Sequence, residues 1–153
     1  LKYREEGVIH LMADCMAWGF PRFDGKGLLI NARAESAMEE RLFGTACSTG
    51  AASFRQKVFT NGINKEKFSF ERYDSPVLFM AGCYNQYDQD RFVILTTDAN
   101  PSVSPVHERM PLILEPDELE SWVLDDRATE FILHKTPVML KSSTEYKQMS
   151  LFL

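Results

Sequence analysis

Short segments of alternating apolar and polar residues run along most of the chain, and turn-forming residues separate them. Five segments fit a β-strand, because they alternate with a period of two or form a short continuous apolar run: residues 7–12, 28–32, 67–71, 76–83 and 92–97. Three shorter segments are further strand candidates: residues 54–59, 111–114 and 137–140. The Asp-Gln-Asp stretch at 88–90 predicts a hairpin, and the small residues of 44–53 predict a loop.

Helix-like spacing is limited to three stretches. Residues 36–42 have a helix-forming composition, and Pro116 fits the first turn of a second helix whose buried stripe contains Trp122. One of the two aspartates at 125–126 would cap a third helix, in which Phe131 faces inward. Many short strands with a few short helices predict an α+β fold, a compact single domain with a mostly antiparallel sheet or partial barrel.

The size and composition are those of an ordinary globular domain, with 153 residues, 44% hydrophobic and 25% charged. The longest strongly apolar run, residues 77–83, is far too short to span a membrane, and no secretion signal opens the chain. The three cysteines lack CxxC spacing, so we expect reduced thiols without a disulfide framework or a zinc site. These features predict a cytoplasmic protein that uses no membrane, metal or cofactor.

The net charge of −5 disfavours nucleic acid as a partner for the chain as a whole. The charge is uneven, however. Residues 1–72 carry 11 Lys/Arg and 9 Asp/Glu, whereas residues 73–153 carry 6 and 13. The first half can therefore carry a basic surface while the second half keeps the protein soluble.

One candidate site contains Trp18 and three polar residues of a predicted strand. Asn31, Arg33 and Glu35 occupy alternating positions, so in a strand they share one face. This set beside a Trp suits a phosphate with an unpaired base, because Arg binds phosphate with paired donors and Trp stacks on bases. The alternative is a solvated strand face on which Arg33 and Glu35 pair with each other, and these residues alone slightly favour it.

A second candidate site begins at the end of the strand predicted at 92–97. Thr96 lies near this end, and His107 and Arg109 follow it at a short distance along the chain. Histidine is the usual proton carrier near neutral pH. The alternative is a loop histidine that hydrogen-bonds to the backbone, which is the better interpretation of an isolated His.

Four motifs in this order resemble the SOS-response-associated peptidase (SRAP) family: WGFP at 18–21, INARAE at 30–35, ILTTDAN at 94–100 and HERMP at 107–111. The resemblance runs from about residue 8 to residue 114 and continues more weakly to residue 140. It implies the family's compact α+β fold and binding of single-stranded DNA at abasic sites. There an N-terminal Cys closes a thiazolidine ring on the sugar aldehyde, and the crosslink shields the lesion. The resemblance also implies a monomer in the bacterial cytoplasm, associated with the nucleoid.

The resemblance implies roles for the residues of both candidate sites. It assigns three residues to the catalytic pocket: His107, Asn31 and Thr96. Asn31 would hold the terminal amine or the sugar, His107 would stabilise or protonate the sugar oxygen, and Thr96 would support the same pocket. Four residues would bind DNA, the arginines at its phosphates and the Trp along its path: Trp18, Arg33, Glu35 and Arg109.

The sequence departs from the family pattern at two points. The 153 residues have no Cys near their first residue, so we expect the native N-terminal segment with the ring-forming Cys to be missing from them. Where the family has an acid/base Glu, one alignment places Ser53 and another places Thr60, and neither carries a carboxylate. The alternative function is a member that binds single-stranded DNA or a sliding clamp without catalysis. A thiol or peptide hydrolase is a third class, and no Cys–His pair supports it.

The last residues contain a candidate docking peptide. Gln148, Leu151 and Phe152 resemble the short motif with which bacterial replication and repair proteins bind the sliding clamp. The Leu–Phe pair would fill a hydrophobic pocket, and Gln148 would hydrogen-bond at its edge. The alternative is a terminal segment packed on its own domain, which is at least as well supported because the motif is short.

Overall fold

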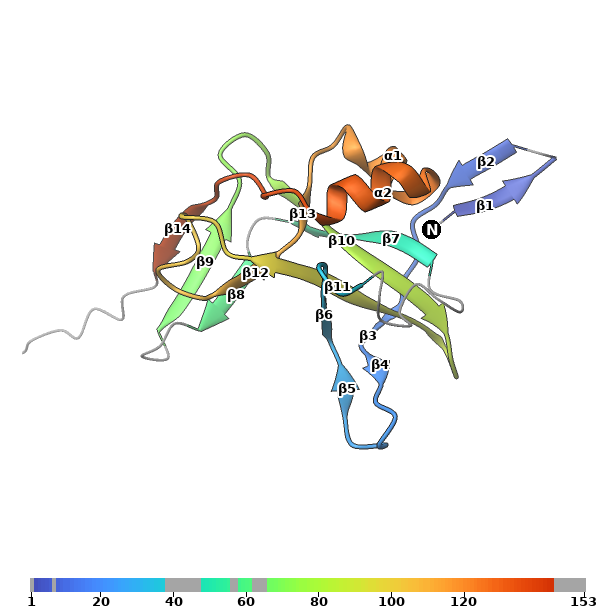
Figure 1. Ribbon diagram of the computed structural model, residues 1–153, viewed down its shortest axis with the longest axis horizontal. Coiled ribbons are helices and arrows are strands. Elements are labelled where there is room, and N and C mark those ends of the chain that lie inside the picture. Colours follow the sequence, from blue (N-terminus) through green and yellow to red (C-terminus); the bar gives the residue numbers. More distant parts are fainter. Residues whose placement is uncertain (1, 7, 38–47, 56–57, 62–65, 145–153) are drawn as a thin grey trace, which may run out of the picture.

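The computed structural model describes residues 2–6, 8–37, 48–55, 58–61 and 66–144, which form short strands and two helices (Figure 1). The strands are β1 (Lys2–Glu5), β2 (Val8–Leu11), β3 (Ala17–Trp18), β4 (Phe20–Pro21), β5 (Leu28–Leu29), β6 (Asn31–Arg33), β7 (Ser48–Arg55), β8 (Val58–Asn61), β9 (Lys67–Glu71), β10 (Val77–Gln86), β11 (Asp90–Asp98), β12 (Arg109–Pro111), β13 (Ile113–Leu114) and β14 (Lys141–Thr144). The helices are α1 (Glu118–Leu124) and α2 (Asp126–Leu133).

Strand β11 is the centre of the main sheet, because other strands pair with both of its edges. One edge pairs antiparallel with β10 along its first half and with β12 along its last three residues. The other edge pairs in parallel with β3 and then with β6. Ile94 and Thr96 have a partner on each edge, so the backbone groups of this buried strand are paired on both sides.

The segment 109–114 lies between β10 and β11 where these two strands separate. It pairs with the end of β11 through β12 and with the first half of β10 through β13. Between them, Leu112 donates its N–H to the Leu95 carbonyl (2.9 Å) and accepts the Ala81 N–H (2.8 Å). Both central strands therefore hold this segment, and the position of its first residue, Arg109, is fixed.

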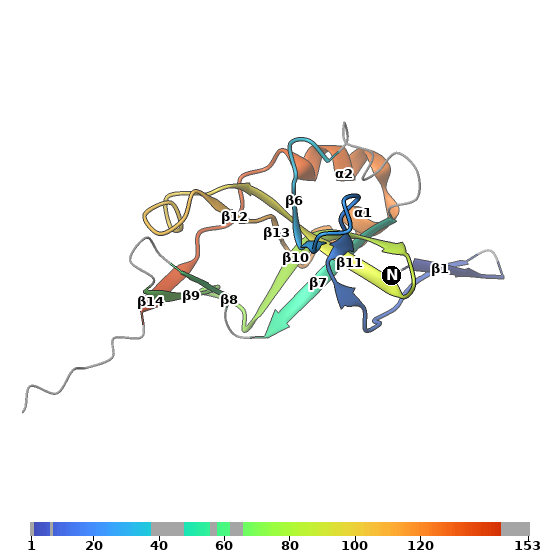
Figure 2. The same cartoon turned by 90° about the horizontal axis from the view of Figure 1, so that it is seen from below.

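Side chains alternate along β10 and β11 and build a core on each face of the sheet. The first core joins these strands to the helices: Ala81, Val93, Leu95, Trp122 and Ile132. The second core joins them to β9: Leu78, Met80, Ile94 and Phe70. The helices α1 and α2 lie side by side over the main sheet, and the sheet β14-β9-β8 lies at the other end of the molecule from the β1–β2 hairpin (Figures 1 and 2).

The predicted α+β class is confirmed, and most strand pairs are antiparallel, with β3 and β6 adding parallel pairs. The predicted cap of α2 is Asp125, whose side chain accepts the backbone N–H groups of Arg127 (2.9 Å) and Ala128 (3.4 Å). Trp122 is buried as predicted. Phe131, however, is 79% exposed, so its predicted inward position is wrong.

Two predicted elements are wrong. Residues 48–53 belong to β7, which pairs with β10 over eight residues, so long-range pairing overrides a loop-like composition. Residues 137–140 form no strand, and the final strand begins at Lys141. The helix predicted at 36–42 lies outside the described residues from position 38 onward. Among the described residues, no helix is long and apolar enough to cross a membrane.

Asn100 fixes the loop between β11 and β12. Its side chain is buried, and its amide donates to the carbonyls of Pro137 (2.9 Å) and Val138 (3.0 Å). Its side-chain oxygen accepts the backbone N–H of Ser102 (3.0 Å), which is an Asx turn. One side chain thus shapes the loop that carries His107 and ties it to the segment after α2.

We predict that Asn100→Ala lowers the free energy of unfolding by about 3 kcal/mol, because it removes the amide donor of one buried and one partly buried carbonyl. Ser104→Ala, at an exposed position of the same loop, is the matched control and should change stability little. Urea unfolding measures both variants. Equal stability of the two would show that Asn100 does not hold the loop.

Candidate functional site

The parallel pairing of β3 and β6 with β11 gathers the predicted site residues. Trp18 lies opposite Phe92, and Arg33 lies opposite Thr96. Paired residues of neighbouring strands present their side chains on the same face of a sheet. Trp18, Arg33 and Thr96, together with Asn31 two positions before Arg33, therefore share one face along β11.

Trp18 is held against β11 and remains 45% exposed. Its ring stacks on Phe92 with 6.1 Å between centroids and 7° between planes, and its Nε1–H donates to the Ile30 carbonyl (2.8 Å). Gly19, next to it, has a φ of +103°, and a Cβ there would lie 3.0 Å from Leu28 Cβ, so only glycine fits comfortably. The chain then turns into the β4–β5 hairpin.

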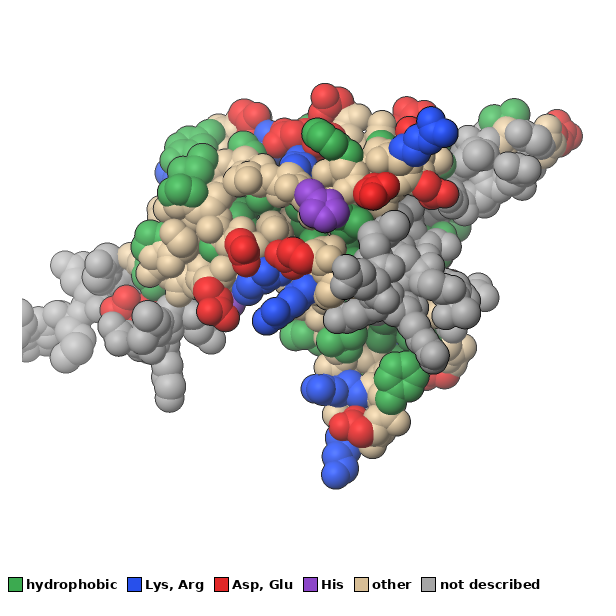
Figure 3. Space-filling model, viewed as in Figure 1, with side chains coloured by type: hydrophobic (Ala, Val, Ile, Leu, Met, Phe, Trp, Pro, Cys, Tyr) green, Lys and Arg blue, Asp and Glu red, His purple; other side chains and the backbone are tan. Residues whose placement is uncertain are grey.

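The β4–β5 hairpin projects from the body of the protein beside these residues (Figure 1). Hydrophobic, basic and acidic side chains lie along the projection in Figure 3. Its exposed side chains include Phe23, which is 109% exposed, and the two cations of the turn, Arg22 and Lys26. This surface therefore combines an exposed aromatic ring and two cations with the Asp24 carboxylate of the same turn.

Arg109 joins three separate segments through its guanidinium group. Nη1 donates to Glu35 Oε1 (2.8 Å) and Asp98 Oδ1 (2.7 Å). Nη2 donates to Glu35 Oε2 (2.8 Å) and the Thr96 carbonyl (2.6 Å). Glu35 therefore pairs with Arg109 and not with Arg33, and both terminal nitrogens of Arg109 already bind protein oxygens.

The Arg109 guanidinium lowers the pKa of Glu35 to about 2, chiefly by hydrogen bonding. The same contact with Glu35 raises the pKa of Arg109. Both groups are therefore charged at neutral pH, and with Asp98 the cluster has one more carboxylate than cation. In contrast, Arg33 is exposed and makes no hydrogen bond or ion pair with the described residues.

His107 is exposed and its ring is oriented by the backbone of Arg109. Nδ1 lies 3.0 Å from the Arg109 nitrogen and 3.0 Å from the Arg109 carbonyl oxygen. The Thr96 hydroxyl donates to the Ala32 carbonyl (3.2 Å), which couples β11 to β6. Among the described residues, neither Asn31 nor the His107 Nε2 atom has a side-chain partner, so both are available to a ligand.

Sequence reasoning gave no role to two polar residues of the second candidate segment. Asp98 is the second carboxylate on Arg109, and Asn100 holds the loop of His107. Their signal was present, since an Asp and an Asn directly after a buried strand are typical of a turn that caps its own backbone. The ion pairs required knowledge of the fold, because Glu35 and Arg109 are 74 positions apart.

Other predicted residues lie where side chains are not described. Gln148, Leu151 and Phe152 are outside the described residues, so their role as a clamp-binding peptide stays a prediction. Ser53 and Thr60, the two candidates for the family's Glu position, lie in β7 and β8. Within the described part of the chain, no group of His, Cys, Asp and Glu side chains is arranged to hold a metal ion.

The residues gathered along β11 belong to the four sequence motifs that resemble the SRAP family. The sequence profile of the SOS response associated peptidase (SRAP) family matches residues 3–150. The chain belongs to the SRAP family.

Two curated relatives are both named abasic site processing proteins. The abasic site processing protein YedK of Escherichia coli (strain K12) is 32% identical over an aligned length of 124 residues, and the alignment covers 74% of this chain and 56% of YedK. The abasic site processing protein YMR114C of Saccharomyces cerevisiae is 27% identical over an aligned length of 130 residues, and the alignment covers 74% of this chain and 35% of that protein. The chain thus spans about half or less of the length of these relatives.

Solved structures with low sequence identity share the fold. A protein of Bordetella bronchiseptica superposes with a TM-score of 0.69 at 21% identity, over 84% of this chain and 75% of its own. A protein of Bacteroides thetaiotaomicron gives a TM-score of 0.64 at 23% identity, over 85% and 68%. These similarities establish the architecture alone.

We predict that Glu35→Gln lowers the free energy of unfolding near neutral pH by about 1 kcal/mol, a small value because the Glu35 side chain is 44% exposed and solvent screens the pair. A carboxyl group whose pKa is lowered in the folded protein stabilises the fold at pH values above its ordinary pKa. This stabilisation is lost as the pH falls through the pKa of the folded state. The difference should therefore shrink between pH 4.5 and about 2.

Urea unfolding at a series of pH values measures this effect. Glu108→Gln is the control, because Glu108 is exposed and has no ion pair among the described residues. A Glu35→Gln loss that is independent of pH, or that equals the control, would contradict the ion pair.

Proposed function

We propose that the chain binds single-stranded DNA at abasic sites and provides the pocket in which the open sugar is captured. The register of β3 and β6 on β11 carries this proposal, because it sets Trp18, Arg33 and Thr96 along one face. An aromatic ring, a free guanidinium and polar groups in one line match a base, a phosphate and a sugar in turn.

In this proposal the DNA runs along β11 past the projecting hairpin. Trp18 lines the path of the unpaired bases, and Arg33 binds a phosphate. Asn31 and Thr96 contact the sugar, with His107 at its oxygen. The names of both curated relatives, abasic site processing proteins, support the choice of lesion.

The covalent step requires the α-amine and thiol of an N-terminal Cys, as the family resemblance implies. The amine adds to the aldehyde carbon of the open sugar, and the resulting carbinolamine loses water to give a C=N bond. The thiol then adds across that bond and closes a thiazolidine ring. One water leaves and no oxidant is needed. An α-amine suits this role because its pKa is about 8, well below that of lysine.

A second candidate function is binding of single-stranded DNA without covalent chemistry. It is favoured by the absence of a carboxylate at both candidate positions for the family's Glu, Ser53 and Thr60. The sliding clamp is a candidate partner of such a non-catalytic protein, and it would bind through Gln148, Leu151 and Phe152. The two functions predict different products with abasic DNA.

We predict that Arg33→Ala weakens binding to single-stranded DNA and reduces the salt dependence. The slope of the logarithm of the association constant against the logarithm of salt concentration should fall by about 0.7, the value for one lost phosphate contact on a single strand. Fluorescence anisotropy at several salt concentrations measures it. Arg127→Ala, an exposed arginine on α2, is the control. Equal slopes for both variants would remove Arg33 from the DNA path.

We predict that a version of the protein beginning Met-Cys forms a heat-stable adduct with single-stranded DNA that contains an abasic site. His107→Ala should slow adduct formation about a hundredfold, the usual effect of losing a positioned proton-transfer group. His134→Ala is the control. Denaturing gel electrophoresis over time measures the rates. If the parent protein binds this DNA but forms no adduct, the non-covalent function is selected instead.

A further inference from the structure

The turn between β10 and β11 is linked to the backbone that carries Trp18. This turn consists of residues 87–89, and Arg91 follows it as the second residue of β11. Arg91 Nη1 donates to the Gly19 carbonyl (3.1 Å), and Arg91 Nε donates to Asp88 Oδ1 (3.3 Å). One guanidinium group therefore joins the residue after Trp18 to the β10–β11 turn.

Gly19 binds the start of β11 through both of its backbone groups. Its N–H donates to the Phe92 carbonyl (2.8 Å), and its carbonyl accepts the bond from Arg91. Its φ of +103° turns the chain from β3 toward the projecting hairpin. Because β3 pairs with β11 at only two positions, the two Gly19 bonds help to set the direction in which the chain leaves the sheet.

A second contact joins the same turn to β4. The ring of Tyr87 lies against the ring of Phe20, with 5.3 Å between centroids and 49° between planes. Phe20 is buried and belongs to the core between the main sheet and the helices. The turn and Arg91 therefore contact two consecutive residues at the base of the β4–β5 hairpin, Gly19 and Phe20.

The orientation of the Trp18 ring depends on where this base is held. The ring stacks on Phe92, and its Nε1–H donates to the Ile30 carbonyl. Both partners are fixed on β11, since Phe92 belongs to it and the Ile30 carbonyl also accepts the Ile94 N–H (3.3 Å). The ring therefore keeps both contacts only while the backbone of Trp18 and Gly19 stays at its place on β11.

Arg91 is poorly placed to contact DNA itself. Its side chain is only 14% exposed. By hydrogen bonding to Asp88, the guanidinium lowers the pKa of that carboxyl group, so the carboxylate is charged at neutral pH and balances the Arg91 charge. A phosphate would meet a largely buried cation that already has a counter-ion.

We propose that Arg91 is a positioning residue for Trp18. Paired with Asp88, it fixes the Gly19 turn on β11, and the turn holds the Trp18 ring in the orientation that stacks on an unpaired base. The stacking on a base rests on the proposed function, whereas the orientation of the ring is a property of the free protein. Arg91 contributes to DNA binding through Trp18 and not through a phosphate.

Solvent exchange of the Trp18 indole N–H, measured by nuclear magnetic resonance of the ¹⁵N-labelled chain, tests this role without DNA. Arg91→Met keeps an unbranched stem but removes the bond to Gly19, so exchange should accelerate about fivefold, the factor for one hydrogen bond. Arg91→Lys can donate to one acceptor but cannot bridge two, so it should restore part of the protection. The buried indole of Trp122 is the internal control and should stay unchanged. Unchanged Trp18 exchange in Arg91→Met would overturn the proposal.

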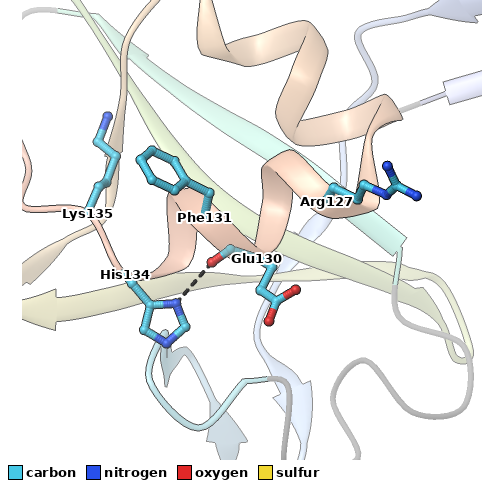
Figure 4. A pocket seen from close by; sticks show the side chains of 5 residues that line it. All are labelled: Arg127, Glu130, Phe131, His134 and Lys135. Carbon is cyan, nitrogen blue, oxygen red and sulfur yellow. Dashed lines mark hydrogen bonds between the residues drawn. The ribbon is translucent and has the colours of Figure 1, made fainter.

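Asp88→Ala separates positioning from electrostatics. The change removes a negative charge, so a purely electrostatic role of this region predicts tighter binding to single-stranded DNA. Positioning predicts the opposite, because Arg91 loses its partner: the Trp18 indole should exchange faster, and affinity should fall about threefold. Glu130→Ala, which removes an exposed carboxylate from α2, is the matched control (Figure 4). Tighter DNA binding with unchanged Trp18 exchange in Asp88→Ala would contradict the positioning role.

Salt dependence distinguishes Arg91 from a phosphate ligand. Positioning predicts that Arg91→Met weakens binding to single-stranded DNA about threefold and leaves the slope against salt concentration equal to that of Arg127→Met, an exposed arginine of α2 (Figure 4). A phosphate contact would lower the slope by about 0.7 relative to this control, and that result would rule out the proposal. Because the exchange measurement needs no DNA, a failure of the proposed DNA function would leave its result intact.

Discussion

The hydrogen bonds along both edges of β11 are the constraint on which the rest of the structure depends. A buried strand must pair its backbone groups, and no single neighbour spans all nine residues of Asp90–Asp98 on either edge. Four segments together pair with most of the strand, with β10 and β12 on one edge and β3 and β6 on the other. Because the two short parallel strands come from an early part of the chain, their polar side chains arrive beside the end of β11.

The Arg109 ion pairs follow from that arrangement. The turn after β6 brings Glu35 to the point where β12 begins, and Arg109 reaches across to it. The forked pair is partly exposed, so its direct contribution to stability is modest. Its larger effect is geometric, because it fixes Arg109, whose backbone contacts His107. Arg33 is then the cation along this face of β11 whose side chain has no protein partner among the described residues.

The sequence predicted the parts of the fold that depend on local pattern. The alternation at 67–71 coincides with β9, and the Asp at 125 caps α2 as proposed. The alternation of Asn31 and Arg33 correctly predicted their shared exposed face. Each of these follows from the repeat of a strand or from the chemistry of one cap, so neighbouring residues suffice to predict it.

The features that failed depend on partners far along the chain. Residues 48–53 have the small side chains of a loop and become a strand because β10 pairs with them. The interpretation of Arg33 and Glu35 as a pair neglected Arg109, which only the fold brings near. The motifs indicated the family, yet the contact between His107 and the Arg109 backbone depends on which side of the β11–β12 ladder each group faces.

The central claim is that the segments paired with β11 form one binding site for a single strand at an abasic position. Its most direct test is a titration of the ¹⁵N-labelled chain with a short single strand containing a stable abasic analogue, followed by amide chemical shifts. The account predicts that the largest changes fall on Trp18, Asn31, Arg33, Thr96 and His107, with α2 unaffected. Largest changes on α2, or equal changes with and without the abasic position, would contradict it.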